Sequence, residues 1–118
     1  MKNVTVVDTT SKYIVKSTGI GSETDQKMIE TSDGFGAVKL EGGNTDSKVS
    51  LIECYHLIEG TGTLTISADD ESTDLSLTGK GKYGLRPGQL KFGNDEQFTL
   101  TTDENITSFL LVTEFRRN

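Results

Sequence analysis

The sequence is poor in the residues that build helices and cross-links. Its 118 residues include two Ala, one Pro, one Cys and no Trp, against seventeen Thr and thirteen Gly. Little Ala and much Thr disfavour α-helices and favour strands joined by turns. A single Cys excludes an internal disulfide, so stability must come from packing or oligomerisation, and a reducing compartment is expected. A chain of this length is predicted to form one domain over residues 1–118.

The charge and hydropathy disfavour two classes of partner. The formal net charge of −6 argues against a non-specific nucleic-acid binder and against binding to an anionic membrane surface. No apolar run approaches the roughly 20 residues that cross a bilayer, and the N-terminal residues lack the apolar core of a signal peptide. We therefore expect a soluble protein, made in a cytoplasm, with neither nucleic acid nor membrane as partner.

The most strongly patterned stretch is residues 48–67, two apolar runs joined by Gly-Thr-Gly at 60–62. In the second run Leu64 and Ile66 alternate with Thr and Ser, which is typical of a half-buried strand. The first run is apolar on both parities, as in a strand covered on both sides or buried at an interface. We predict that the two runs pair as a core hairpin, with the glycines forming the turn.

Short β-forming runs recur along the rest of the chain, at residues 4–7, 12–18, 36–40, 74–78, 89–92, 97–101 and 106–115. Residues 93–95 are predicted to form a turn, and residues 25–31 fit either a strand or a helical turn. About eight to ten short antiparallel strands, with turn signals between them, predict an all-β single domain. We expect a β-sandwich of jelly-roll or Greek-key type, or a small barrel.

The candidate chemical groups do not form a recognisable catalytic or metal site. His56 and Cys54 share a parity, but side chains at i and i+2 of a strand stand about 7 Å apart, too far for a hydrogen bond. Four acidic residues within 69–74 lack the spacing of a calcium loop. The Gly-rich residues 79–84 lack the Lys-Ser/Thr and helix of a phosphate loop. We therefore expect no enzyme, catalytic residue, metal or cofactor.

Residues 56–62 and the later Pro87-Gly88 look somewhat like a single-domain cupin. That family binds its metal with a His-x-His pair, a Glu and a later His, whereas this chain has one histidine. The resemblance implies at most a metal-free, cupin-like small-molecule binder or isomerase. Its site would be a barrel mouth around Glu53, Tyr55 and His56.

Two longer segments carry a second resemblance: DTTSKYIVKSTGIGSETDQ at 8–26 and LTGKGKYGLRPGQ at 77–89. With the central runs VSLIECYHLI and GTGTLTIS between them, they resemble small β-rich virion proteins of tailed, especially marine, bacteriophages. The resemblance covers nearly all of the chain. It implies a non-enzymatic structural protein, of capsid decoration or cement type, that binds the head shell. The alternative within a phage particle is a tail-fibre or receptor-binding module that uses exposed aromatics such as Tyr83.

Four basic residues of this acidic chain, Lys80, Lys82, Arg86 and Lys91, form a basic stretch. Such a stretch is either a solvated face or a docking patch for an acidic partner surface. The predicted contact surface comprises Tyr13, Ile14, Lys80, Lys82, Tyr83, Arg86, Phe115, Arg116 and Arg117. The expected partners are the major capsid protein or other virion proteins, and further copies of the chain. The expected location is the virion, most simply the head surface, after synthesis in the host cytoplasm.

Overall fold

The computed structural model describes residues 1–9, 11–30, 48–68, 71–84 and 91–117, and within them it contains ten strands and no helix. The strands are β1 (Lys2–Asp8), β2 (Lys12–Gly19), β3 (Gln26–Glu30), β4 (Val49–Gly60), β5 (Leu64–Ala68), β6 (Leu75–Leu77), β7 (Lys80–Tyr83), β8 (Phe92–Asp95), β9 (Gln97–Thr102) and β10 (Ile106–Arg117). The all-β prediction is confirmed. The ambiguous segment 25–31 contains a strand, and the strand predicted at 36–40 lies outside the described residues.

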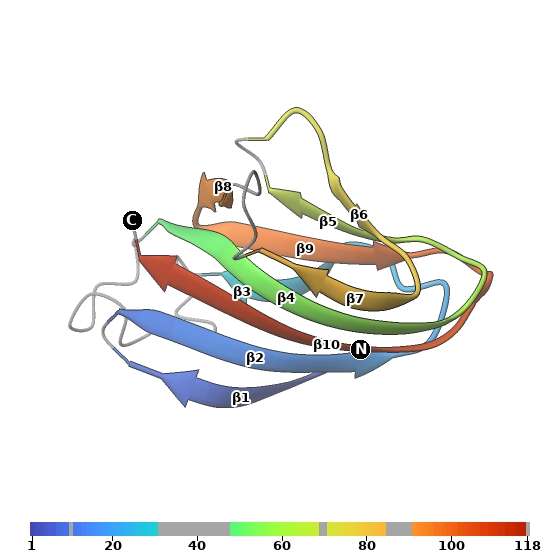
Figure 1. The fold of residues 1–118 in the computed structure, drawn as a ribbon. Coiled ribbons are helices and arrows are strands. Elements are labelled where there is room, and N and C mark those ends of the chain that lie inside the picture. The colour runs from blue at the N-terminus through green and yellow to red at the C-terminus, as the bar shows by residue number, and fades with distance from the viewer. Residues whose placement is uncertain (10, 31–47, 69–70, 85–90, 118) are drawn as a thin grey trace.

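The strands form two antiparallel sheets that pack face to face (Figure 1). Sheet A has the order β1-β2-β10-β4-β7, with β8 also pairing with β4, and sheet B has the order β3-β9-β5-β6. The chain repeatedly crosses between them, from β2 to β3, from β4 to β5 and from β6 to β7. This alternation is the jelly-roll arrangement of a two-sheet sandwich.

Strands β4 and β10 form the centre of sheet A and are the longest in the molecule (Figure 1). Each has twelve residues, so not all the strands are as short as the sequence suggested. They pair from Ile106 opposite Gly60 to Arg117 opposite Val49, with a register shift near each end. On its other side β10 pairs with β2, so its backbone is bonded along both edges.

The predicted core hairpin over residues 48–67 is wrong. Strand β4 belongs to sheet A and β5 to sheet B, so the Gly-Thr-Gly segment carries the chain across the sandwich instead of reversing it within one sheet. Gly60 has a φ of +100° and Gly62 is buried against Asp103 and Ile106. These glycines let the crossing pass close to the turn before β10, where Thr61 N donates to Asn105 O at 3.2 Å.

Gly60→Ala is expected to lower the free energy of unfolding by about 1–3 kcal/mol. The left-handed φ disfavours any side chain, and a Cβ at this position would also overlap the carbonyl oxygen of Asn105. Chemical denaturation measures the loss. Gly79→Ala is the matched control, because Gly79 has a φ of +61° but no other heavy atom within 4 Å of the added Cβ. An equal loss in both variants would mean that the backbone near Gly60 moves to accommodate the added Cβ without a further loss of stability.

The turn predicted at residues 93–95 is also wrong. Residues 92–95 form β8, which pairs with the start of β4. Gly93 has a φ of +77°, and a Cβ there would lie 2.7 Å from the ring of Phe98. The glycine therefore lets an irregular strand pass over an aromatic ring, and the chain turns one residue later, at Glu96.

The core lies between the two sheets and is centred on aromatic side chains. Phe98 of β9 lies 5.0 Å from Phe115 of β10 and 6.2 Å from Phe92 of β8, measured between ring centroids. These contacts join sheet B to sheet A, and tilted rings at such distances attract one another beyond their area burial. Tyr13 and Val15 of β2 are buried in the same cluster.

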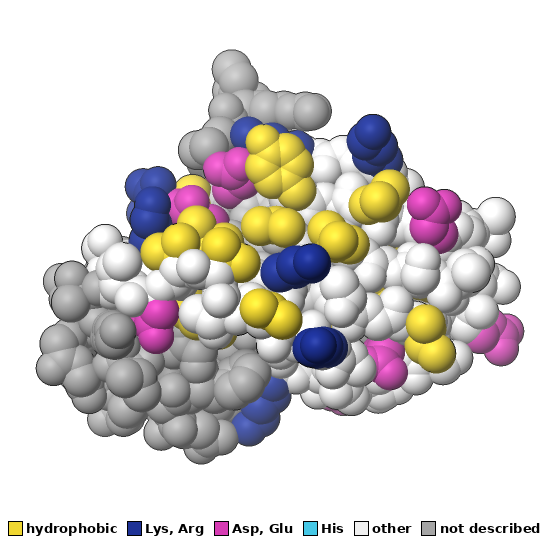
Figure 2. All heavy atoms as spheres, turned by 90° about the horizontal axis from the view of Figure 1, so that it is seen from below, with side chains coloured by type: hydrophobic (Ala, Val, Ile, Leu, Met, Phe, Trp, Pro, Cys, Tyr) yellow, Lys and Arg dark blue, Asp and Glu magenta, His cyan; other side chains and the backbone are white. Residues whose placement is uncertain are grey.

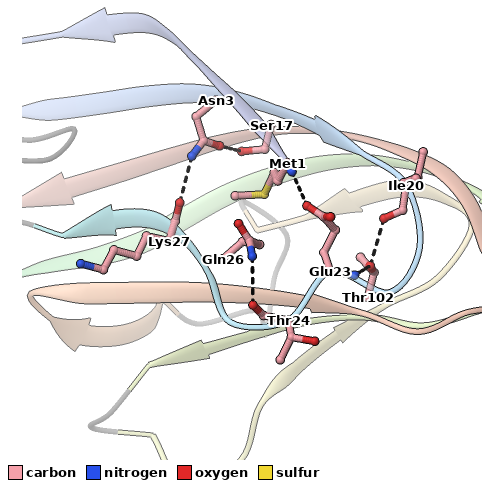
Figure 3. Close-up of polar contacts among 9 residues, drawn as sticks. All are labelled: Met1, Asn3, Ser17, Ile20, Glu23, Thr24, Gln26, Lys27 and Thr102. Atoms are coloured by element: carbon pink, nitrogen blue, oxygen red, sulfur yellow. Dashed lines mark hydrogen bonds and ion pairs between the residues drawn. The ribbon is translucent and has the colours of Figure 1, made fainter.

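Polar contacts close one side of the sandwich (Figure 3). Asn3 of β1 accepts a hydrogen bond from Ser17 Oγ at 2.6 Å and donates one to the carbonyl of Lys27 in β3 at 2.9 Å. The link between β2 and β3 is fixed to β9 through Thr102, whose hydroxyl accepts from Glu23 N at 3.0 Å and donates to Ile20 O at 3.1 Å. This side is therefore held by specific bonds as well as by the core.

Candidate docking face

The side of sheet A that points away from the core carries an unusual mixture of apolar and basic side chains. We call it the outer face of sheet A. Its apolar side chains are Val4, Val7, Ile14, Tyr55, Leu57, Leu110 and Val112. Its charged side chains are Lys2, Lys12, Lys16, Lys80, Lys82, Arg116, Glu53, Glu59 and Glu114. Figure 2 shows hydrophobic side chains gathered across this face, with Lys and Arg side chains among them.

Three of the five large hydrophobic side chains that are exposed in the described residues lie on this face. Val4 is 46 % exposed, Tyr55 50 % and Leu57 41 %. Single exposed apolar residues are ordinary, whereas a contiguous group of them marks a contact surface. No described segment of the chain covers the outer face.

The strand register builds this group from residues far apart in the sequence. Val112 of β10 lies opposite Lys16 of β2 on one side and Tyr55 of β4 on the other. Tyr55 in turn lies opposite Lys82 of β7. Directly opposed side chains on one sheet face are close enough to pack. One continuous row therefore runs across sheet A, with apolar residues at its middle and lysines beside them.

Lys82 is held in place by two neighbours on β4. Its Nζ lies 3.0 Å from Glu53 Oε1 and 4.9 Å from the centroid of the Tyr55 ring. The hydrogen bond with Glu53 is the main cause that raises the pKa of Lys82. The lysine therefore remains charged and fixed over an exposed aromatic ring, where a cation is attracted to the ring face.

A small hollow of about 120 Å³ lies beside this row, lined by Ile14, Glu53, Tyr55, Val112 and Glu114. Glu53 and Glu114 lie directly opposite one another on β4 and β10, an arrangement that alone would be repulsive. Each has its own cation, since Glu53 pairs with Lys82 and Glu114 with Arg116. The hollow is thus locally neutral, with apolar walls that suit the apolar part of a partner's side chain.

The structure brings four of the predicted contact residues onto one face and separates them from Tyr13, Tyr83 and Phe115. Ile14, Lys80, Lys82 and Arg116 all lie on the outer face of sheet A, although they come from three strands. Residues 86 and 117 were also predicted, but Arg86 and the side chain of Arg117 lie outside the described part of the chain.

The prediction was wrong for Tyr13 and Phe115 as contact residues. Tyr13 is 2 % exposed and Phe115 fully buried, because both occupy inward positions of their strands. Burial raises the pKa of the Tyr13 phenol, whose oxygen lies 2.9 Å from Thr5 Oγ1. Tyr83 of β7 packs partly against the core, and burial raises its pKa as well, so it offers little exposed ring to a glycan.

Three exposed apolar members of the face, Tyr55, Leu57 and Val4, were not among the predicted contact residues. A signal for the first two was present in the sequence, since residues 51–58 are apolar on both parities. The structure confirms that a strand in one sheet of a sandwich can bury only one of these faces within the chain. Lys16 was missed because nothing in its local sequence places it beside Val112 and Val4.

The residues expected to form a cupin-like mouth do not converge. Glu53 and Tyr55 point outward from β4, whereas His56 points to the other side and lines an open hollow of about 280 Å³ with Leu77, Tyr83 and their neighbours. His56 Nδ1 lies 3.0 Å from Gly79 O, so the backbone satisfies one ring nitrogen. Within the described residues no group of three or more His, Cys, Asp and Glu is placed to hold a metal ion.

Cys54 is buried beside Thr113, whose Oγ1 lies 3.4 Å from the sulfur. Burial is the main cause that raises the pKa of its thiol to about 11. As the pH rises, the Cys54 thiol ionises in the unfolded chain before it ionises in the folded chain. Raising the pH therefore favours the unfolded state. We expect the free energy of unfolding to fall by up to about 1.4 kcal/mol per pH unit between roughly pH 9 and 11.

Denaturation at several alkaline pH values measures this slope, with Cys54→Ala as the control in which the thiol contribution is missing. A shallower slope in the alanine variant is the expected result. If both proteins lose stability equally, the thiol does not remain protonated in the folded state. A thiol reagent at neutral pH is expected to react with native Cys54 no faster than the chain opens, because the thiolate is the reactive form.

The opposite surface of the sandwich has a different character. On the outward side of sheet B, Thr65 lies opposite Thr101 and Ser76, and Ser67 lies opposite Thr99. All five side chains are short, uncharged and at least partly exposed. The two broad surfaces of the molecule are therefore unequal, one apolar and basic and the other covered with hydroxyl groups.

Comparison with known proteins gives one structural neighbour. No family model matches the sequence, and no curated protein sequence matches it. A solved structure of a cupin domain from Bordetella pertussis Tohama I aligns over 99 % of this chain and 92 % of its own, with 10 % identity and a TM-score of 0.47. A likeness at this level carries no argument about function. No helix in the described residues is long and apolar enough to span a membrane.

Proposed function

We propose that the chain is a structural protein of a tailed-phage particle, a capsid decoration or cement protein that docks on the head shell through the outer face of sheet A. The exposed apolar row of that face carries the proposal. The resemblance of the sequence to small virion proteins is the reason for proposing a phage particle. The outer face of sheet A is the surface through which the chain would attach to it. The protein acts by binding and has no catalytic role.

The size of the face supports this use. Five strands about 4.8 Å apart, each contributing about seven residues at about 3.3 Å, cover roughly 500 Å². Docking would bury about twice this area in total, at the lower end of specific interfaces. One such contact is modest, but many copies on a symmetric shell would each add buried area and stabilise the assembled state by mass action.

The inequality of the two surfaces supports one orientation. A sandwich that binds with sheet A leaves the hydroxyl-bearing side of sheet B toward water, where Thr and Ser are readily solvated. The apolar side chains Val4, Tyr55 and Leu57 are then covered. Further copies of the chain are expected as neighbours on the same shell.

The test is the number of copies of this chain per purified particle, measured by quantitative mass spectrometry against the major shell protein. A large number that matches the symmetry of the shell is the expected result. A handful of copies would place the chain in the tail or a fibre and reject the decoration role. Absence from particles would reject a virion role altogether.

A further inference from the structure

The charges of the molecule are strongly segregated. Among the side chains that the structure describes, the outer face of sheet A carries six of the nine Lys and Arg residues but three of the twelve Asp and Glu residues. Two of these three acids, Glu53 and Glu114, are already paired with Lys82 and Arg116. The face is therefore basic, although the whole chain has a net charge of −6.

Four lysines on the face, Lys2, Lys12, Lys16 and Lys80, make no ion pair within the described residues. From these observations we infer that the outer face of sheet A fits an acidic protein surface with apolar side chains between its carboxylates. This inference rests on the proposed docking function and adds the chemistry of the partner. Complementary charge of this kind guides association and rejects wrong partners.

The same pattern disfavours pairing of two copies face to face. Such a dimer would bring the lysines of one basic face against those of another, and like charges brought together at an interface cost several kcal/mol. A foreign surface with the opposite charge avoids this repulsion.

Nucleic acid and lipid fit the face less well than protein does. Nucleic acids are bound mainly through cations and polar groups at the phosphates, which leaves Val4, Tyr55 and Leu57 exposed and unused. Peripheral membrane binding buries an apolar face several ångströms deep in the headgroup region. On the outer face of sheet A the apolar residues lie directly beside lysines, so they cannot enter the headgroup region without the charged groups. This arrangement suits a second protein surface.

The first experiment uses a carbodiimide, which joins a lysine amine directly to a carboxylate that it touches. Purified particles and, separately, lysates of infected host cells are treated, and the linked peptides are identified by mass spectrometry. We expect bonds from Lys16, Lys80 or Lys2 to Asp or Glu residues of another protein. Bonds from this face only to further copies of the chain would overturn the inference. So would bonds from Lys48 and Lys91 with none from the face.

The second experiment compares two variants with the same change in net charge. Lys16→Glu with Lys80→Glu is expected to reduce retention on particles at least about tenfold. Lys48→Glu with Lys91→Glu, at exposed positions just before β4 and β8 and outside the paired strands, is expected to leave retention unchanged. Equal retention of both variants would overturn the inference. Binding of the purified chain to a DNA duplex or to phosphatidylglycerol vesicles, lost in the first variant, would overturn it in favour of those partners.

The outcomes separate this inference from the proposed function. If the chain is absent from particles but its face lysines are cross-linked to acidic residues of a protein in the lysate, the virion role fails and the acidic partner stands. If the chain is abundant on particles but the face lysines form no bond to another protein, the virion role stands and the acidic partner is rejected.

Discussion

Phe115→Ala is expected to lower the free energy of unfolding by about 3–5 kcal/mol, the range for removing a large aromatic side chain from a core. The Phe115 ring is fully buried and lies 5.0 Å from the ring of Phe98 in the opposite sheet. Strand β10 places it between Tyr13 of β2 and Leu51 of β4. Its loss would therefore leave a cavity at the point where the two sheets meet. Denaturant titration followed by circular dichroism measures the change.

The adjacent residue provides the control. Arg116 points outward, and its side chain is 53 % exposed. Arg116→Ala removes a surface ion pair and is expected to cost less than about 1 kcal/mol. If Phe115→Ala left stability unchanged and instead prevented binding to particles, the aromatic ring would be a contact residue, as the sequence had suggested, and its burial in the core would be wrong.

The sequence predicted the buried side chains correctly in strands where apolar residues occupy only every second position. In β5 and β9 apolar residues alternate with Thr or Ser, and the structure buries Leu64, Ile66, Phe98 and Leu100 as that pattern predicts. Such signals depend on neighbours within a few residues, so the strands and the fold class could be predicted. The Gly-containing segments at 60–62 and 93–95 were less informative, because glycine allows a positive φ in a crossing or in an irregular strand as well as in a turn.

The assignment of strands to sheets could not be predicted from the same signals. Alternation identifies which side of a strand is buried, but a strand of sheet A and a strand of sheet B bury their sides against the same core. Residues 48–60 and 64–68 therefore look like two halves of a hairpin, although β4 and β5 belong to different sheets. The choice depends on pairing with β9 and β10, whose partner residues lie at least 30 residues away along the chain.

The docking face was only partly predictable for a related reason. In β10 both parities are apolar, so the local pattern does not tell Phe115, which is inward, from Val112, which is outward. The exposure of Tyr55 and Leu57 follows from their register with Val112 and Leu110. The sequence indicated that these strands have more apolar surface than one thin sandwich hides, and the structure identifies which side chains remain outside.

The largest effect on docking is expected from Tyr55→Thr combined with Leu57→Thr. Both side chains are exposed, at 50 % and 41 %, so the fold should lose about 1 kcal/mol or less. Threonine keeps the strand-forming character of β4 while removing the apolar area at the middle of the face. Residues at the centre of an interface each contribute about 2 kcal/mol or more when they act as anchors. We expect the number of copies per particle to fall at least about tenfold.

The matched control is Thr65→Ala combined with Ser67→Ala, two positions with the same spacing on the outward side of sheet B. These changes should leave the number of copies per particle unaltered, because that side is predicted to lie toward water. Both variants must first show the unfolding behaviour of the parent protein, so that reduced binding reports the lost surface. Equal binding by the two variants would mean that the apolar row of sheet A is not the attachment site. Reduced binding by the control alone would reverse the proposed orientation, since sheet B would then face the shell.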